Sequence, residues 1–304
     1  MVYSGRNEEL VGPVIEEFEA ATGIDVEVRY AGTSELAATI LEEGGNSPAD
    51  VFFSQDAGAL GALANEDRLA ALPADVLELV DARFRSPDRD WVGVTGRARV
   101  LAYDTRELSA GDMPDSVMDL TGPEWRGRIG WVPTNASFQT FVTALRLELG
   151  DDGTKTWLED MLANEPRTYE GNSAALQAVA AGEIDVALVN HYYLYAAKAG
   201  NPSIPVNNHF FPGGDPGALV NVAGVGILDT APHAGAADAF VRYLLSTEAQ
   251  THFAEQTFEY ALIDGIAPAE GLPALAEIES PDLDLTDLAD LEGTIRLLQE
   301  AGVL

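Results

Sequence analysis

The sequence predicts an α/β protein with about two domains. Short apolar segments alternate almost throughout with segments whose apolar residues recur at helical spacing. The chain has 304 residues, of which 46% are hydrophobic, so it can bury large cores. It contains no cysteine, which removes disulfides, thiolate metal sites and cysteine nucleophiles from consideration.

The first part of the chain shows this alternation clearly. Apolar residues at helical spacing predict a helix over 7–21, which Gly23 ends. Alternating residues predict a strand over 24–30, and a second helix begins at Ser34. A short buried strand follows over 50–53, and we expect the residues after it to project into a crevice.

The same pattern continues to the end of the chain without a repeat or a low-complexity linker. The domains are therefore expected to be joined by extended strands rather than by flexible tethers. Strands are predicted over 99–103, 129–132, 185–189 and 222–228, and helices over 138–149, around Phe240–Leu244 and over Leu288–Leu298.

The charge of the chain excludes two classes of partner. With 50 acidic and 17 basic residues, the net charge is -33, which repels nucleic acid and anionic membrane surfaces. No stretch approaches the roughly 20 apolar residues of a bilayer span, so we expect no membrane insertion of the mature chain. The start, Met1-Val2-Tyr3-Ser4-Gly5, is typical of a strand and turn, so an exported protein would have lost its signal.

The most unusual local feature is a pair of tyrosines, Tyr192 and Tyr193, after the predicted strand over 185–189. Ligand groups in α/β sheets lie at such carboxyl ends. Adjacent tyrosines would point in different directions, so a shared core role is less economical than one polar site, although amphipathic packing remains equally open. A phenolate is a hard anionic oxygen donor that suits a hard trivalent cation.

Three segments have residues suited to binding an anion. The loop before the helix over 138–149 contains Asn135, Ala136 and Ser137, and Asn172 also precedes a helical segment. Amides at a helix start bind anions, but ordinary N-caps use the same residues. Arg97, in Gly96-Arg97-Ala98-Arg99, offers a guanidinium that can bind carbonate or phosphate through two hydrogen bonds.

Taken together, these segments resemble the ferric-ion-binding proteins, the solute-binding components of ABC-type iron(III) importers. The resemblance covers essentially the whole chain. It is most specific at the tyrosine pair and is also seen in the following segments: Ala20-Ala21-Thr22-Gly23-Ile24, Pro48-Ala49-Asp50-Val51-Phe52, Thr95-Gly96-Arg97-Ala98-Arg99-Val100, Asn172-Ser173-Ala174-Ala175-Leu176-Gln177-Ala178-Val179, Asn190-His191-Tyr192-Tyr193 and Asp215-Pro216-Gly217-Ala218-Leu219-Val220.

The resemblance implies a two-lobed, class II periplasmic-binding-protein-like fold with two crossing hinge strands and a ligand cleft between the lobes. We expect a first lobe formed by 1–98 and 222–270, and a second lobe formed by 99–221 and 271–304. Iron(III) would be the cargo, and Tyr192 and Tyr193 would be its ligands from the second lobe. A synergistic carbonate or phosphate would be held by Arg97, Asn135, Ala136, Ser137, Asn172 and Asn190.

The chain departs from the family at two positions in the first lobe. Asn7 stands where many relatives have a histidine, and Gln55 stands where they have a glutamate. The first lobe therefore offers no certain ligand, and Glu8, Asp56, an anion oxygen or water could complete the site. His191 adjoins the tyrosine pair, but we expect its side chain to point away from the metal.

By the same resemblance, the protein would be an exported monomer, periplasmic or tethered outside the cell membrane, that delivers iron to an ABC transporter permease. A second possibility keeps this fold with another cargo, an oxyanion or a small organic solute. An enzyme on a related two-lobed fold is the weaker alternative, because the four histidines are scattered and no nucleophile or phosphate-loop motif occurs.

Overall fold

The computed structural model describes residues 1–304, which form two compact units. The lobes expected from the sequence have limits at residues 98, 222 and 270, and the units divide the chain after Gly96, Val220 and Leu272. The segment Asp284–Ala289 differs, because it belongs to the first unit and not to the second. The first unit comprises Met1–Gly96, Asn221–Leu272 and Asp284–Ala289, and the second comprises Arg97–Val220, Pro273–Leu283 and Asp290–Leu304.

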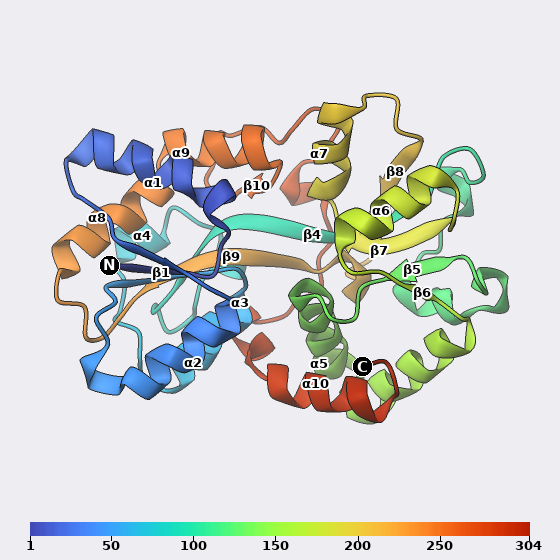
Figure 1. The fold of residues 1–304 in the computed structure, drawn as a ribbon, viewed down its shortest axis with the longest axis horizontal. Helices are drawn as coiled ribbons and strands as arrows, with labels where there is room; N and C mark the ends of the chain where they lie inside the picture. Colours follow the sequence, from blue (N-terminus) through green and yellow to red (C-terminus); the bar gives the residue numbers. More distant parts are fainter. The chain divides into compact units, whose positions relative to one another are not determined.

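The first unit is built on a mixed sheet with strand order β2-β1-β3-β9-β4. Strand β1 pairs in parallel with β2 and β3, whereas β3 and β9 are antiparallel. Helices α1 and α8 lie side by side (Figure 1), and the ring of Phe18 on α1 is 5.1 Å from that of Phe240 on α8. The strands are β1 (Val2–Ser4), β2 (Val28–Tyr30), β3 (Val51–Ser54), β4 (Val92–Asp104), β9 (Val220–Ile227) and β10 (Tyr260–Ala261); the helices are α1 (Glu8–Thr22), α2 (Thr33–Glu43), α3 (Ala57–Asn65), α4 (Ala74–Leu77), α8 (Ala234–Leu244) and α9 (Thr247–His252).

The second unit continues strand β4 and places β7 beside it. Strand β7 runs antiparallel to β4 and parallel to β5, and β8 also pairs with β4. Aromatic rings from β5 and α5 form a continuous edge-to-face core from Trp131 through Phe138 and Phe141 to Trp157. The remaining strands are β5 (Ile129–Trp131), β6 (Arg167–Thr168), β7 (Val186–Asn190) and β8 (Val206–His209); the helices are α5 (Ala136–Ala163), α6 (Asn172–Ala181), α7 (Tyr192–Gly200) and α10 (Leu291–Glu300).

Short helical turns complete both units, and no helix is long and apolar enough to cross a membrane. The turns are Gly44–Asn46, Ala82–Phe84, Ala110–Asp112, Val117–Thr121, Pro123–Trp125, Pro216–Ala218, Leu275–Glu277 and Leu285–Ala289, with one π-helical turn at Phe253–Thr257.

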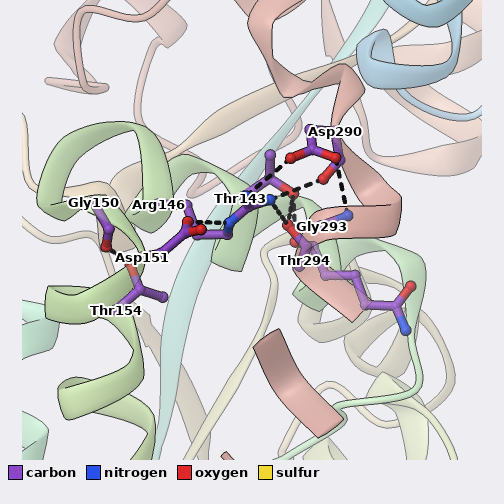
Figure 2. Close-up of polar contacts among 9 residues, drawn as sticks. Thr143, Arg146, Gly150, Asp151, Thr154, Asp290, Gly293 and Thr294 are labelled. Carbon is purple, nitrogen blue, oxygen red and sulfur yellow. Dashed lines mark hydrogen bonds and ion pairs between the residues drawn. The ribbon is translucent and has the colours of Figure 1, made fainter. Parts of the chain in front are cut away.

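Helix α5 is interrupted at Gly150, whose φ of 72° breaks the helical backbone. The helix predicted over 138–149 therefore continues after a kink. Arg146, just before the kink, donates from Nε to Asp151 and from Nη2 to Asp290, the N-cap of α10 (Figure 2). The hydroxyls of Thr143 and Thr294 are 2.8 Å apart. These contacts fasten α10 to the half of α5 that begins at the predicted anion loop.

Three element limits differ from the sequence prediction. Strand β2 covers only Val28–Tyr30, because the amide of Val26 is taken by the side chain of Glu19. Strand β4 is far longer than 99–103, since it finds pairing partners in both units. Leu288 lies in the turn Leu285–Ala289, so the last helix begins at Leu291.

Candidate functional site

The tyrosine pair opens helix α7, directly after β7 and His191. Tyr192 and Tyr193 are half-buried, and their rings stack with centroids 4.4 Å apart and planes inclined by 30°. The expectation that adjacent tyrosines point in different directions is therefore wrong here. The two residues begin the helix, where no preceding turn crowds their side chains. The two phenol rings consequently lie together at the start of helix α7.

Beside this pair lies a buried arginine, Arg99 on β4, which is 3% exposed. Its Nη1 donates to Oδ1 of Asn190 at 3.2 Å and to Oγ of Ser137 at 3.3 Å. Burial lowers the pKa of Arg99 to about 10, and charge on Tyr193 and Tyr192 would oppose that change. The guanidinium thus remains charged at neutral pH and connects the end of β7 to the start of α5.

The guanidinium of Arg99 lies over the rings of Phe138 and Phe141, but the rest of its N–H groups have no hydrogen-bond partner. Its Nε and Nη2 are buried, and neither makes a hydrogen bond. These two N–H groups form one edge of the planar fork, the arrangement that binds two oxygens of an oxyanion at once. A buried donor pair left without an acceptor is costly, so this edge is the strongest indication of a ligand in the second unit.

The two predicted helix starts behave differently. Asn135 is an ordinary N-cap, because its Oδ1 accepts from the amide of Ser137 at 3.0 Å and from its hydroxyl at 2.5 Å. Ala136 is the exposed first residue of the same helix. Asn172 is not a cap: it follows Gly171 into α6, is 2% exposed, and neither Oδ1 nor Nδ2 has a hydrogen-bond partner. A buried open amide of this kind suits a ligand.

Arg97 lies two residues before Arg99 on β4, so both side chains leave the same face of the strand. Arg97 is also buried, at 4% exposure. The contacts to Ser137 and Asn190, however, are made by Arg99. Sequence reasoning named Arg97 and passed over Arg99, although pairing of β4 with the strand before the tyrosines would have singled out Arg99, the partner of Asn190.

The four first-unit candidates follow two strands, β1 and β3, whose carboxyl ends lie at the same edge of the sheet. Strands β1 and β3 are adjacent and parallel, so the loops after them share their carboxyl end. Asn7 is an exposed N-cap residue without a side-chain cap bond, and Glu8 is the exposed first residue of α1. Gln55 is half-buried, and Asp56 caps α3 by accepting from the amide of Ala59 at 3.0 Å.

A buried ion pair that the sequence did not reveal supports these loops. Arg6 donates from Nη2 and Nη1 to the two carboxylate oxygens of Glu259, at 2.8 and 3.2 Å, and from Nη1 to the hydroxyl of Thr95. Both side chains are almost fully buried, at 0% and 3% exposure. Through Arg6, the turn that carries Asn7 is thus attached to Thr95 and to Glu259, which are both distant in the sequence.

Comparison with known proteins agrees with this architecture. The family model described as bacterial extracellular solute-binding protein matches residues 46–284. The major ferric iron-binding protein of Neisseria meningitidis serogroup B is 36% identical over 99% of this chain and 92% of its own length. The Fe(3+)-binding periplasmic protein of Serratia marcescens is 34% identical over 100% of this chain and 90% of its own.

The solved structures give the same result. The crystal structure of iron-bound HitA from Pseudomonas aeruginosa superposes with a TM-score of 0.91 at 36% identity, and the match covers 99% of this chain and 98% of that one. The fold is therefore the α/β periplasmic-binding-protein fold predicted from the sequence. With relatives matched over their full length, the chain belongs to the bacterial extracellular solute-binding proteins, a family of non-enzymatic binding proteins.

Proposed function

We propose that this protein binds ferric iron for uptake, with the phenolates of Tyr192 and Tyr193 as ligands and an anion on Arg99. The full-length similarity to ferric iron-binding proteins supports the cargo. The observation that carries the site is the stacked tyrosine pair beside a buried arginine whose Nε and Nη2 are open.

The chemistry of the tyrosines favours a trivalent cation. A free phenol has a pKa near 10, so it ionises at neutral pH only if a strongly charged cation replaces its proton. Iron(III) is such a cation and prefers hard oxygen donors. Arg99, which is charged at neutral pH, lies beside the pair, and the pair begins helix α7.

A charge and ligand count supports an accompanying anion. Iron(III) carries three positive charges and takes about six donor atoms, whereas two phenolates supply only two negative charges and two donor atoms. Carbonate or phosphate would add donors and the missing negative charge. The open edge of Arg99 fits two oxygens of either anion, and Asn172, Asn190 and the α5 start with Ala136 and Ser137 would hold the others. We place carbonate first, because a planar anion matches the planar fork.

The remaining donor atoms of the metal would come from the first unit, from the anion or from water. Among the first-unit candidates, Glu8 and Asp56 are the only anionic side chains, and Asp56 already caps α3.

We also propose that the protein works outside the cytoplasmic membrane, as its family does, and passes iron to an ABC transporter permease. An oxyanion or organic cargo is the alternative, and the open Arg99 and Asn172 groups are the observation that favours it.

Titration of the iron-free protein with ferric nitrilotriacetate tests the proposal. Phenolate-to-iron charge transfer should give an orange to red absorption band that saturates at one iron per chain. Tyr192→Phe and Tyr193→Phe should remove or strongly weaken it. Tyr195→Phe is the matched control, since Tyr195 is a buried tyrosine of the same helix outside the pair. A protein without the band, or with a band indifferent to Tyr192 and Tyr193, contradicts iron binding at this pair.

A further inference from the structure

The β4–β7 ladder ends in an unusual way just before the tyrosines. Its last pair is Arg99 with Asn190, so Ala98 and His191 would form the next pair. Antiparallel ladders alternate between pairs that exchange two backbone hydrogen bonds and pairs that exchange none. In the same register Asp104 faces Asp185, three alternating pairs further along, and the amide of Asp104 donates to the carbonyl of Asp185 at 2.9 Å. By this alternation, Ala98 and His191 should exchange two hydrogen bonds.

Only one of these two bonds is a backbone bond. The amide of His191 donates to the carbonyl of Ala98 at 3.0 Å, as the ladder requires. The return bond cannot form, because His191 has helical dihedrals of -56° and -41°, and its carbonyl turns toward Asn208 Nδ2 at 2.9 Å and the amide of Leu194. The amide of Ala98 donates instead to Nδ1 of the His191 ring at 3.1 Å.

The imidazole thus takes the place of a missing strand carbonyl. Because Nδ1 accepts a hydrogen bond, the ring proton is on Nε2. The ring is fully buried and packs edge to face against Tyr192, with centroids 5.7 Å apart and planes at 89°. An amide buried without an acceptor would be unfavourable, so the ring is what allows the chain to leave the sheet and begin α7 at this residue.

This two-bond contact joins the two segments that carry the candidate ligands. Ala98 lies next to Arg99 on β4, and His191 lies between Asn190 and Tyr192. The contact between Ala98 and His191 therefore fixes the distance between Arg99 on β4 and the start of α7 at Tyr192. Residues that orient the metal ligands without binding the metal themselves contribute strongly to metal affinity.

We propose that His191 is a positioning residue: its Nδ1, by accepting from the amide of Ala98, holds Tyr192, Tyr193 and Arg99 in their binding arrangement before iron arrives. This inference rests on the proposed function. It deepens that function by assigning a role to a side chain that is not itself a metal ligand.

The side chains that could replace His191 separate this role from simple packing. Asparagine places its Oδ1 where histidine has Nδ1, so it can still accept from Ala98. Glutamine is longer and places its amide near the position of Nε2. Leucine fills space but offers no acceptor. If the acceptor matters, His191→Asn should therefore preserve what His191→Gln and His191→Leu lose.

The experiment measures ferric affinity by competition with citrate, the position of the charge-transfer band, and the melting temperature of the iron-free protein. We expect His191→Leu to bind iron about 10–100-fold more weakly, with a shifted band, and His191→Asn to recover most of that loss. If His191→Leu does not fold, His191→Gln against His191→Asn gives the same comparison. Two outcomes would overturn the proposal and leave His191 with a packing role alone. In the first, His191→Leu has a lower melting temperature but the wild-type ferric affinity and band position. In the second, the Asn, Gln and Leu variants lose ferric affinity equally.

Failure of the proposed function would look different. It would be visible in the wild-type protein as the absence of a band, or in Tyr193→Phe as an unchanged band, and either result overturns both proposals. A normal wild-type band that is lost in Tyr193→Phe but unaffected by His191→Leu overturns the positioning role alone.

Discussion

Arg6 in the first unit and Arg99 in the second are both buried, and the two arginines differ in what they contact. Arg6, in the first unit, uses both Nη atoms on the carboxylate of Glu259, so its charge is neutralised within the protein. Arg99, in the second unit, donates only to neutral oxygens, lies over the rings of Phe138 and Phe141, and has no hydrogen-bond partner at Nε and Nη2. Burying an unpaired charge is costly unless a ligand completes it. Arg6 is therefore satisfied within the fold, whereas Arg99 is the arginine that we propose for the anion site.

The asparagines and aspartates of the two units repeat this contrast. In the first unit, Asp56 is used by the helix that follows it. In the second unit, Asn172 is buried with its whole amide unsatisfied. Substitutions should accordingly affect iron binding in the second unit and folding in the first.

The largest effect is expected for the double variant Tyr192→Phe/Tyr193→Phe. It removes both anionic donors but keeps the rings, so the stack and the fold should remain. The charge-transfer band should disappear, while the melting temperature of the iron-free protein should stay within a few degrees. Retention of tight ferric binding by this variant would move the metal site away from the second unit.

The next effect concerns the first unit. Glu259→Gln leaves Arg6 as an unpaired buried charge and should cost about 3–5 kcal/mol of unfolding free energy, measured by urea denaturation. Replacing both residues with methionine should cost much less, because no charge is then left buried. Below the unfolding transition, the iron band of Glu259→Gln should match the wild type. A specific loss of iron affinity without loss of stability would contradict the contrast between the units.

A smaller effect, on binding alone, is expected for Arg99→Lys. Lysine keeps the charge but loses the planar fork, so iron binding in carbonate buffer should weaken by about 10–100-fold. Arg97→Lys is the matched variant on the same strand face, and it should weaken binding less. The reverse order would restore Arg97 as the anion-binding arginine. Equal affinities with and without carbonate or phosphate would instead remove the anion from the site.

Most helices and strands could be predicted from the sequence, because the patterns that indicate them lie within short segments of the chain. The periodicity of 7–21 and the glycine after it predicted α1 to within a residue, and the run at 185–189 predicted β7. Strand β4 was underestimated, because its length depends on partners far away in the chain. The same limit applies to the site. The tyrosine pair was visible as a pattern, whereas Arg99 and His191 acquire their contacts only from the β4–β7 register.

The smallest effects are expected from the loops of the first unit. Asp56→Asn keeps an oxygen that can cap α3 but removes the negative charge, so it separates the capping role from a role as a ferric ligand. If capping is its role, citrate competition should give an affinity within about threefold of the wild type, a difference of about 0.7 kcal/mol. Asn7→Ala should also change little, because the Asn7 side chain is exposed and makes no cap bond. A loss of tenfold or more in Asp56→Asn, with an unchanged melting temperature, would show that the first unit contributes an anionic donor and is not merely a support.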